Sequence, residues 1–139
     1  MKYILKFNEN LLIDKSSELV RKIKKNLTPD LLKGIWKKDD PKNYSGYCYV
    51  ATEALYWMLG GPKSDYYPYV LGNKDWPEGL NPGETHWFLK NKSDKVIDPT
   101  KEQFGELVVP YNKGKANGMM NYPVGGSKRC KILIDRIKS

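Results

Sequence analysis

The sequence contains a single histidine, and an aspartate lies at a spacing that could bring the two side chains together. His86 begins the apolar segment 86–89, and Asp98 ends a second apolar segment, 95–98. Two such segments around a polar turn predict a β-hairpin. With the turn centred on Lys92, His86 would face Asp98 on the same side of the sheet, where a carboxylate can hold and orient an imidazole. A turn shifted by one residue would place them on opposite faces.

Cys48 could supply a nucleophile to this pair. It lies near the start of an apolar segment that Gly60 and Gly61 end, so we expect a helix capped by Ser45, with Cys48 at about its third position. The dipole and unpaired N–H groups of a helix N-terminus favour a thiolate, as does a nearby imidazolium. These residue types predict thiol chemistry on a carbonyl, in which Cys48 attacks, His86 transfers protons and Asp98 orients His86.

Each of the three residues also has a purely structural interpretation. Cys48 could be a small buried side chain, and His86 a hydrogen-bonded core histidine. Asp98 could begin an Asx turn with Thr100, which is common at the end of a strand. The presence of all three residue types at matching positions favours the functional interpretation. Cys130 lies on the apolar stripe of a predicted C-terminal helix, so we expect it to be a core residue.

The segments that contain these residues resemble a known group of proteins. The motifs are G-Y-C-x-V-A-x-E-A-L-Y-x-x-x-G-G at 46–61, H-W-F-L at 86–89 and I-D-P-T-x-x-Q-F at 97–104. They resemble small bacterial and bacteriophage YunG-like proteins that share a papain-like Cys-His-Asp core, over roughly residues 28–130. The resemblance implies a papain-like minimal fold, with Cys48 as nucleophile, His86 as general base and Asp98 as the orienting acid. It also implies that Gln103 lines or supports the site.

The expected oxyanion site departs from the papain-like pattern. Papain-like proteases place a glutamine several residues before the cysteine, and this chain has none between residues 33 and 48. Asn43 is the best chemical substitute, with Tyr44 and Ser45 as alternatives. Otherwise the oxyanion would depend on backbone N–H groups alone. This departure leaves open a binding module that holds a ligand in the same pocket without converting it.

Aromatic side chains are expected to form the walls of that pocket. The chain has ten tyrosines and four tryptophans, whose polar-tipped rings suit a concave site. Residues 62–85 are predicted to form a long loop with a short strand at 69–71, which serves as a substrate wall or a packed lid. The residues assigned to the pocket are Tyr47, Tyr66, Tyr67, Trp76, Trp87 and Tyr111.

The remaining patterns predict the elements around the site. Residues 2–7 favour a short strand or an arm, and an amphipathic helix begins at Ser16 or Ser17. Thr28-Pro29-Asp30 is typical of the start of a second, short helix that includes Ile35 and Trp36. Residues 105–127 are expected to be mostly loop. Ser127 can cap a final helix, with a strand over 131–135 as the alternative. We therefore predict one α+β domain over 1–139, with helices packed on a small antiparallel sheet.

Composition narrows the classes of protein to consider. The formal charge of +8 comes from scattered lysines and arginines, so a solvated basic surface is favoured over nucleic-acid binding. No apolar run reaches the ~20 residues that span a bilayer, and residues 1–6 do not form a signal peptide. We therefore expect a cytoplasmic protein, in a host cytoplasm if phage-encoded, with reduced thiols. One histidine and two distant cysteines predict no metal site, and no phosphate-binding glycine loop or other cofactor motif occurs.

The sequence thus predicts a cysteine hydrolase or acyl/amide transferase that acts on an amide, isopeptide or thioester. The substrate would be a small molecule or an extended peptide-like tail, and the positive charge favours an acidic one. The alternative is an inactive binding module, such as a phage-encoded inhibitor or sponge of a host signal or protein. Nucleic-acid binding through the basic surface is the third hypothesis. Neither the substrate nor the oligomeric state follows from the sequence.

Overall fold

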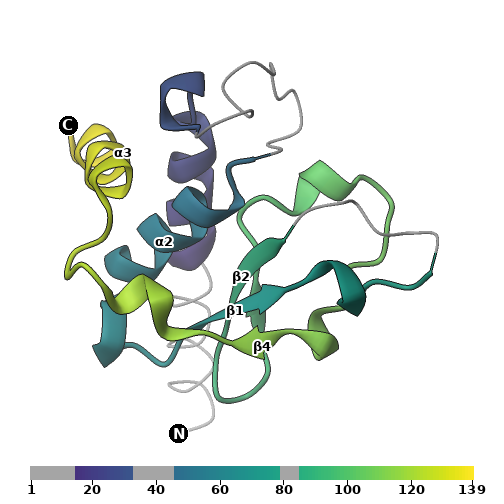
Figure 1. The fold of residues 1–139 in the computed structure, drawn as a ribbon. Helices are drawn as coiled ribbons and strands as arrows, with labels where there is room; N and C mark the ends of the chain where they lie inside the picture. The colour runs from purple at the N-terminus through teal and green to yellow at the C-terminus, as the bar shows by residue number, and fades with distance from the viewer. Residues whose placement is uncertain (1–14, 33–45, 79–84) are drawn as a thin grey trace, which may run out of the picture.

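A computed structural model of the chain describes residues 15–32, 46–78 and 85–139 (Figure 1). The described part is α+β, as predicted, with a four-stranded antiparallel sheet in the order β3-β2-β1-β4. The strands are β1 (Tyr67–Leu71), β2 (His86–Lys90), β3 (Val96–Ile97) and β4 (Lys115–Ala116). The helices are one that includes residues 15–25, α2 (Cys48–Met58) and α3 (Lys128–Lys138). None of the described helices is long and apolar enough to cross a membrane.

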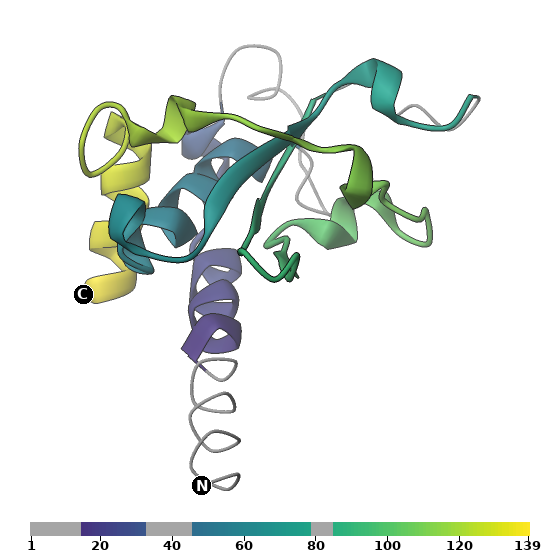
Figure 2. The same ribbon diagram turned by 90° about the horizontal axis from the view of Figure 1, so that it is seen from below.

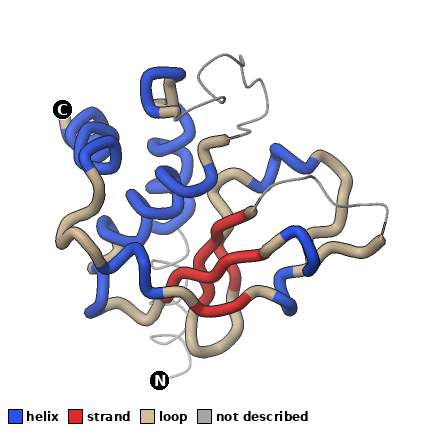
Figure 3. Tube along the Cα trace, in the orientation of Figure 1, coloured by secondary structure: helices blue, strands red, loops and turns tan. Residues whose placement is uncertain are grey.

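The three described helices lie on one side of the sheet, and the segment 98–113 between β3 and β4 lies on the other (Figures 2 and 3). Two hydrophobic cores follow from this arrangement. The larger core joins the helices to the β2 side chains Trp87 and Leu89. The smaller core lies on the opposite face of the sheet, where Phe88 packs with Phe104 and neighbouring residues. Alternate residues of β2 therefore point into different cores, as the pleat of a strand requires.

The N-terminal region agrees with the sequence in part. The predicted helix forms over residues 15–25, and Ile23 on its apolar face is fully buried. Pro29–Leu31, however, is a single 3-10 turn, because Leu32 already has an extended backbone with φ −82° and ψ 152°. The predicted second helix is therefore reduced to one turn among the described residues. Its expected continuation through Ile35 and Trp36 lies outside those residues, as does the predicted strand or arm at 2–7.

Helix α2 is the central element of the larger core. Most of its length is apolar or small, and Val50, Ala51, Ala54 and Leu55 are completely buried. The predicted stop is confirmed, because α2 ends at Met58 and both following glycines, at 60 and 61, have positive φ angles of 122° and 59°. Glycine adopts such angles at little cost, so the chain can turn sharply toward β1.

The β2–β3 hairpin forms with a register that differs from the predicted one. Lys90 pairs with Val96 and Leu89 pairs with Ile97, so the ladder is displaced by two residues from the register in which His86 faces Asp98. The turn is tied together by Asn91, whose side-chain oxygen accepts hydrogen bonds from the backbone of Ser93 and Lys95, each at 2.9 Å. Because side chains alternate with a period of two, a displacement by two residues leaves every side chain on its original face.

The C-terminal part contains one element that the sequence did not predict. Residues 105–127 are mostly loop and 3-10 turns, as expected, but Lys115–Ala116 forms the edge strand β4 on β1. Gly114 leads into this strand and passes so close to Phe88 that an added Cβ would lie 2.5 Å from its ring. A residue without a side chain is therefore needed there.

The C-terminal segment forms helix α3 and not the strand over 131–135 that was the alternative prediction. A buried carboxylate fixes this helix to α2. The Ser127 hydroxyl accepts a hydrogen bond from the Cys130 backbone, which confirms the predicted cap. Ser127 also donates two hydrogen bonds to Glu53 of α2, from its backbone N–H at 2.9 Å and its hydroxyl at 2.7 Å. Since Glu53 is almost completely buried, these bonds satisfy a group that would otherwise be costly inside the protein.

Candidate active site

His86 and Asp98 form a buried, hydrogen-bonded pair. His86 Nε2 lies 2.6 Å from Asp98 Oδ2, and the two side chains are 0% and 2% exposed. The predicted contact between them therefore exists, although the predicted register is wrong by two residues. An even displacement keeps both side chains on one face, so a diagonal pair replaces a directly opposed pair.

Asp98 has further partners that fix the position of its carboxylate. Oδ1 accepts a hydrogen bond from the backbone N–H of Thr100 at 3.2 Å, which is the Asx turn considered as the structural alternative. Oδ2 also accepts a hydrogen bond from the Tyr111 hydroxyl at 2.7 Å. The structural and functional interpretations of Asp98 are therefore compatible, because one oxygen holds the turn and the other holds His86.

The second ring nitrogen of His86 faces an amide. Gln103 Nε2 lies 3.3 Å from His86 Nδ1 and donates a hydrogen bond to Thr100 Oγ1 at 2.8 Å. The Phe104 ring meets the imidazole edge to face, with 4.5 Å between the ring centroids. The residues 98–104 thus surround the imidazole on several sides. Gln103 therefore lies beside the histidine, where a residue that lines or supports the site is expected.

Cys48 is the first residue of α2, with Tyr47 as the N-cap residue. The predicted position, about the third of the helix, was therefore wrong by about two residues, because the helix begins later than a cap at Ser45 would place it. The Cys48 side chain is close to the beginning of β2: Sγ donates a hydrogen bond to the Thr85 carbonyl at 3.7 Å and interacts with the side chain of His86. Cys48 is 8% exposed.

The contacts of His86 change its protonation. Burial of the ring lowers the pKa of His86, but hydrogen bonds with Asp98 and Cys48 raise it, and the net result is a pKa of about 9. His86 therefore remains an imidazolium at neutral pH. This buried positive charge interacts with the Asp98 carboxylate and with the Cys48 side chain.

The residues assigned to the pocket are not gathered in one place. Trp76 packs against Phe104 at a centroid distance of 4.9 Å and so lies near the His86 side of the sheet. Trp87 points to the opposite face of β2 and packs edge to face on Tyr49. Tyr47 is buried in the same larger core. The expectation of one aromatic pocket around Cys48 is therefore not met by these residues.

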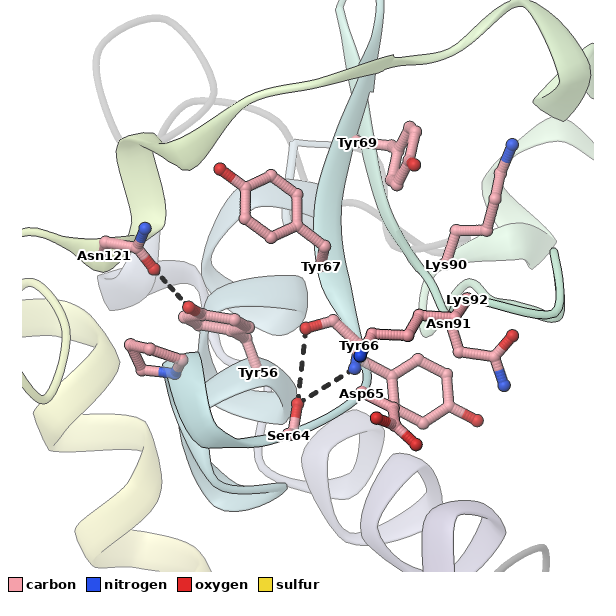
Figure 4. A pocket seen from close by; sticks show the side chains of 11 residues that line it. Tyr56, Ser64, Asp65, Tyr66, Tyr67, Tyr69, Lys90, Asn91, Lys92 and Asn121 are labelled. Atoms are coloured by element: carbon pink, nitrogen blue, oxygen red, sulfur yellow. Dashed lines mark hydrogen bonds between the residues drawn. The ribbon is translucent and has the colours of Figure 1, made fainter.

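Two other pocket residues, Tyr66 and Tyr67, lie at the far end of the sheet. They line a cavity of about 330 Å³ next to the β2–β3 turn, whereas His86 is at the opposite end of β2 (Figure 4). Asn43 and Ser45, the residues expected to support the oxyanion, lie outside the described residues. The structure thus brings together Cys48, His86 and Asp98 with two supporting side chains, Gln103 and Tyr111.

Cys130 differs from Cys48 in its surroundings. Both cysteines are free thiols, but Cys130 is completely buried, and burial raises the pKa of its thiol to about 12. Its predicted role as a core residue is confirmed. Among the residues that the structure describes, no group of three or more histidine, cysteine, aspartate or glutamate side chains could hold a metal ion.

The sequence did not reveal how Tyr111 and Thr100 act at the site. Tyr111 was assigned to the substrate pocket, but its hydroxyl binds Asp98, thirteen residues earlier in the chain. No periodic pattern links these two positions, because the intervening residues form loop and 3-10 turns. For Thr100, the D-P-T motif predicted the bond from its backbone to Asp98, but not the bond from Gln103 to its hydroxyl.

Comparisons with models of protein families, with curated proteins and with solved structures found no match for this chain.

Proposed function

We propose that this protein is a papain-like cysteine hydrolase or acyl/amide transferase, with Cys48 as nucleophile, His86 as general base and acid, and Asp98 as the residue that orients His86. The observation that carries the proposal is the position of His86, which interacts with Cys48 and is bonded through Nε2 to Asp98. An imidazole that interacts with both a thiol and a carboxylate is the arrangement used in nucleophilic thiol catalysis.

In the first half of the reaction, the Cys48 thiolate attacks the carbonyl carbon of an amide, isopeptide or thioester. A sulfur–carbon bond forms, and the π electrons of the carbonyl move to its oxygen. When this intermediate collapses, the bond to the leaving group breaks, and the imidazolium of His86 gives its proton to a leaving amine. The acyl group is then held on Cys48 as a thioester.

In the second half, water or an amine attacks the thioester carbonyl while His86 takes a proton from it. The carbon–sulfur bond breaks, Cys48 leaves as a thiolate, and His86 is again an imidazolium. Water gives hydrolysis, and an amine gives acyl transfer. Cys48 is the first residue of α2, and in this mechanism N–H groups of the first helical turn would bind the oxyanion that forms in each half.

The burial of the site limits the substrates that fit this mechanism. His86 is completely enclosed, and Cys48 is only slightly exposed, so a substrate must reach the thiol with a narrow group. We therefore propose a small molecule or an extended, peptide-like tail as the substrate. The positive charge of the chain favours an acidic one, because it raises the local concentration of anions.

One observation favours the alternative function, a binding module that does not convert its ligand. The Gln103 amide lies 3.3 Å from His86 Nδ1, the ring nitrogen that Asp98 does not occupy. The amide occupies a position beside this nitrogen that Cys48 would need in order to exchange a proton with it. In this alternative the same residues form a rigid polar support, and a ligand or partner is held beside Cys48 without chemistry.

The test is the rate at which iodoacetamide alkylates Cys48 between pH 5 and 9, followed by mass spectrometry of peptides. An activated Cys48 should react at pH 6 at least about tenfold faster than free cysteine, because most of a free thiol is protonated there. Cys130 is the internal control, since its buried thiol should not react in the folded protein.

Two variants decide between the mechanisms. His86→Gln should slow alkylation of Cys48 at pH 6 by about tenfold if the imidazolium activates the thiol. Gln103→Ala should leave the rate the same or increase it, because the competing amide is removed. A Cys48 that reacts no faster than free cysteine in the folded wild-type protein would contradict the enzymatic proposal and favour the binding module. Circular dichroism must confirm that both variants fold.

A further inference from the structure

A groove lies between the helix of residues 15–25 and β3, the strand at one edge of the sheet. Two adjoining cavities of about 330 and 450 Å³ form it, and both are lined by Ser17 and Val20. The first cavity is also lined by Ser16 and by residues 95–98, and the second by Arg21, Lys24 and Lys25. We call this surface the β3 groove.

The outer edge of β3 carries a backbone donor and a backbone acceptor that β2 does not use. The sheet order places β3 at the edge, with β2 as its single neighbour in the sheet. The backbone N–H of Asn91 donates a hydrogen bond to the Lys95 carbonyl at 3.0 Å, so residues 95 and 97 direct their backbone groups toward β2. The N–H and C=O of Val96 therefore point away from β2, on the side of the groove. Such an edge can pair with an extended peptide as an additional strand.

The floor of the groove is apolar. Val20 of the helix and Ile97 of β3 pack at the border of the larger core, and both are half-buried, so part of each side chain faces the groove. Side chains alternate along a strand, so the peptide residues on either side of the one paired with Val96 would face the helix, as Ile97 does. One of these positions therefore suits a β-branched or other apolar residue.

The walls of the groove carry positive charge that is not neutralised. Arg21, Lys25 and Lys95 form no ion pair with any described residue, whereas Lys24 is paired with Glu102. The three cations lie on both walls, two on the helix and one at the beginning of β3. Acidic side chains on either side of a central apolar residue would complement this distribution of charge.

We propose that the β3 groove binds an extended acidic peptide segment of a partner protein as an additional strand on β3. Val96 would exchange two backbone hydrogen bonds with the peptide, an apolar side chain would pack on the floor, and carboxylates would meet the three cations. Asp98 also lines the groove but does not oppose such a ligand, because its side chain is 2% exposed and bonded to His86. A nucleic acid could use the cations but has no peptide backbone to pair with the strand edge. This binding does not depend on chemistry at Cys48.

The test is titration of the full chain with a blocked hexapeptide, Asp-Glu-Val-Thr-Glu-Asp, followed by amide chemical shifts. The shifts of β3 and of the helix should change and saturate at millimolar peptide. The same peptide with an N-methyl group on its threonine lacks the N–H that pairs with the Val96 carbonyl, so it should bind at least about fivefold more weakly. A peptide with lysine at all four acidic positions should show no saturable binding.

Two neighbouring residues of the helix provide a matched pair of variants. Arg21→Glu reverses a charge in the groove and should weaken binding of the acidic hexapeptide by about fivefold. Lys22→Glu reverses a charge outside the lining, at a residue paired with Glu18, and should change the affinity by less than about twofold. Both positions are exposed, and circular dichroism shows whether each variant is folded.

Three results would overturn the proposal. The first is the absence of saturable binding of the acidic hexapeptide at millimolar concentration. The second is equal affinity for the N-methylated peptide, or equal affinity of the folded Arg21→Glu variant, because neither the strand edge nor the charge would then be used. The third is a stronger response of the same amides to a single-stranded oligothymidylate, which would make the groove a nucleic-acid site.

Discussion

The strands β1 and β2 have two unlike ends. At one end Leu71 pairs with His86, whose imidazole is enclosed with Asp98. At the other end Tyr67 pairs with Lys90 at the side of an accessible cavity. The two ends share a ladder and a face of the sheet, but turns from the segment after β3 cover only the first with Phe104 and Tyr111. Burial makes charge interactions at the first end strong, while exposure leaves the second end available to a ligand.

The largest effect on the free energy of unfolding should come from removing the charge of Asp98, at the buried end of the sheet. Asp98→Asn leaves the imidazole of His86 without its carboxylate, so we expect a loss of about 4 kcal/mol in the free energy of unfolding. Alkylation of Cys48 at pH 6 should also slow by about tenfold, because the imidazolium is no longer stabilised. Urea denaturation and mass spectrometry measure the two effects.

Asp94→Asn is the matched control, since Asp94 carries the same charge in the same hairpin but is exposed. It should change the free energy of unfolding by less than about 0.5 kcal/mol. Similar losses for both variants would mean that the two ends of the hairpin do not differ as their burial indicates.

The pH dependence of stability should show the raised pKa of His86. Its pKa is about 9 in the folded protein, compared with an ordinary value of 6.5, so the folded state binds the proton more tightly. The stabilisation is therefore complete below about pH 6.5 and is lost as the pH rises through 9, by about 3 kcal/mol in total. Urea denaturation of wild type and His86→Gln across this range should show a steeper decline for the wild type. Parallel declines would contradict the prediction.

A smaller effect is expected from the hydroxyl that supports Asp98. Tyr111→Phe removes one hydrogen bond to the carboxylate and keeps the ring that packs on Phe88, so stability should fall by about 1–2 kcal/mol. Cys48 alkylation should slow only slightly, because His86 remains bonded to Asp98. Tyr122→Phe, at an exposed position, is the control and should have no measurable effect on urea denaturation. A loss larger than that of Asp98→Asn would mean that Tyr111 has a different main role.

A smaller effect on stability than that of Tyr111→Phe is expected from Lys90, at the cavity end of the sheet. Lys90→Met removes the cation above Tyr69 and a weak ion pair, so the free energy of unfolding should change by less than about 1 kcal/mol. The alkylation rate of Cys48 should stay the same, since distant sites act independently. A changed rate, measured as for Asp98→Asn, would show that the two ends are coupled.

The sequence predicted the face shared by His86 and Asp98 more reliably than the pairing between the strands. Residue parity determines the face, whereas the register depends on the turn, and the Asn91 side chain extends this turn through bonds to Ser93 and Lys95. The hairpin pattern does not encode that choice. The start of α2 was placed too early for a related reason, because propensity marks a helix terminus only to within a few residues.

The sequence pattern did not predict contacts between residues that are far apart in the chain. Strand β4 has only two residues, too few for an alternating pattern, and depends on Gly114 passing close to Phe88. Tyr66 and Tyr67 are far from Cys48 because β1 pairs with β2 in antiparallel orientation. The sequence pattern does not predict this pairing. Composition indicated an aromatic pocket, but the sheet distributes those rings between two cores and two ends.

The buried bonds between Glu53 and Ser127 have a consequence for any shortened version of the chain. A fragment that ended before Ser127 would still contain Cys48, His86 and Asp98. It would nevertheless lack both hydrogen-bond donors to the Glu53 carboxylate, five residues after Cys48 on the same helix. Without these donors the carboxylate would stay buried at a cost in stability, unless α2 shifted to bring it into water. The smallest unit that preserves the helix bearing Cys48 therefore extends into α3.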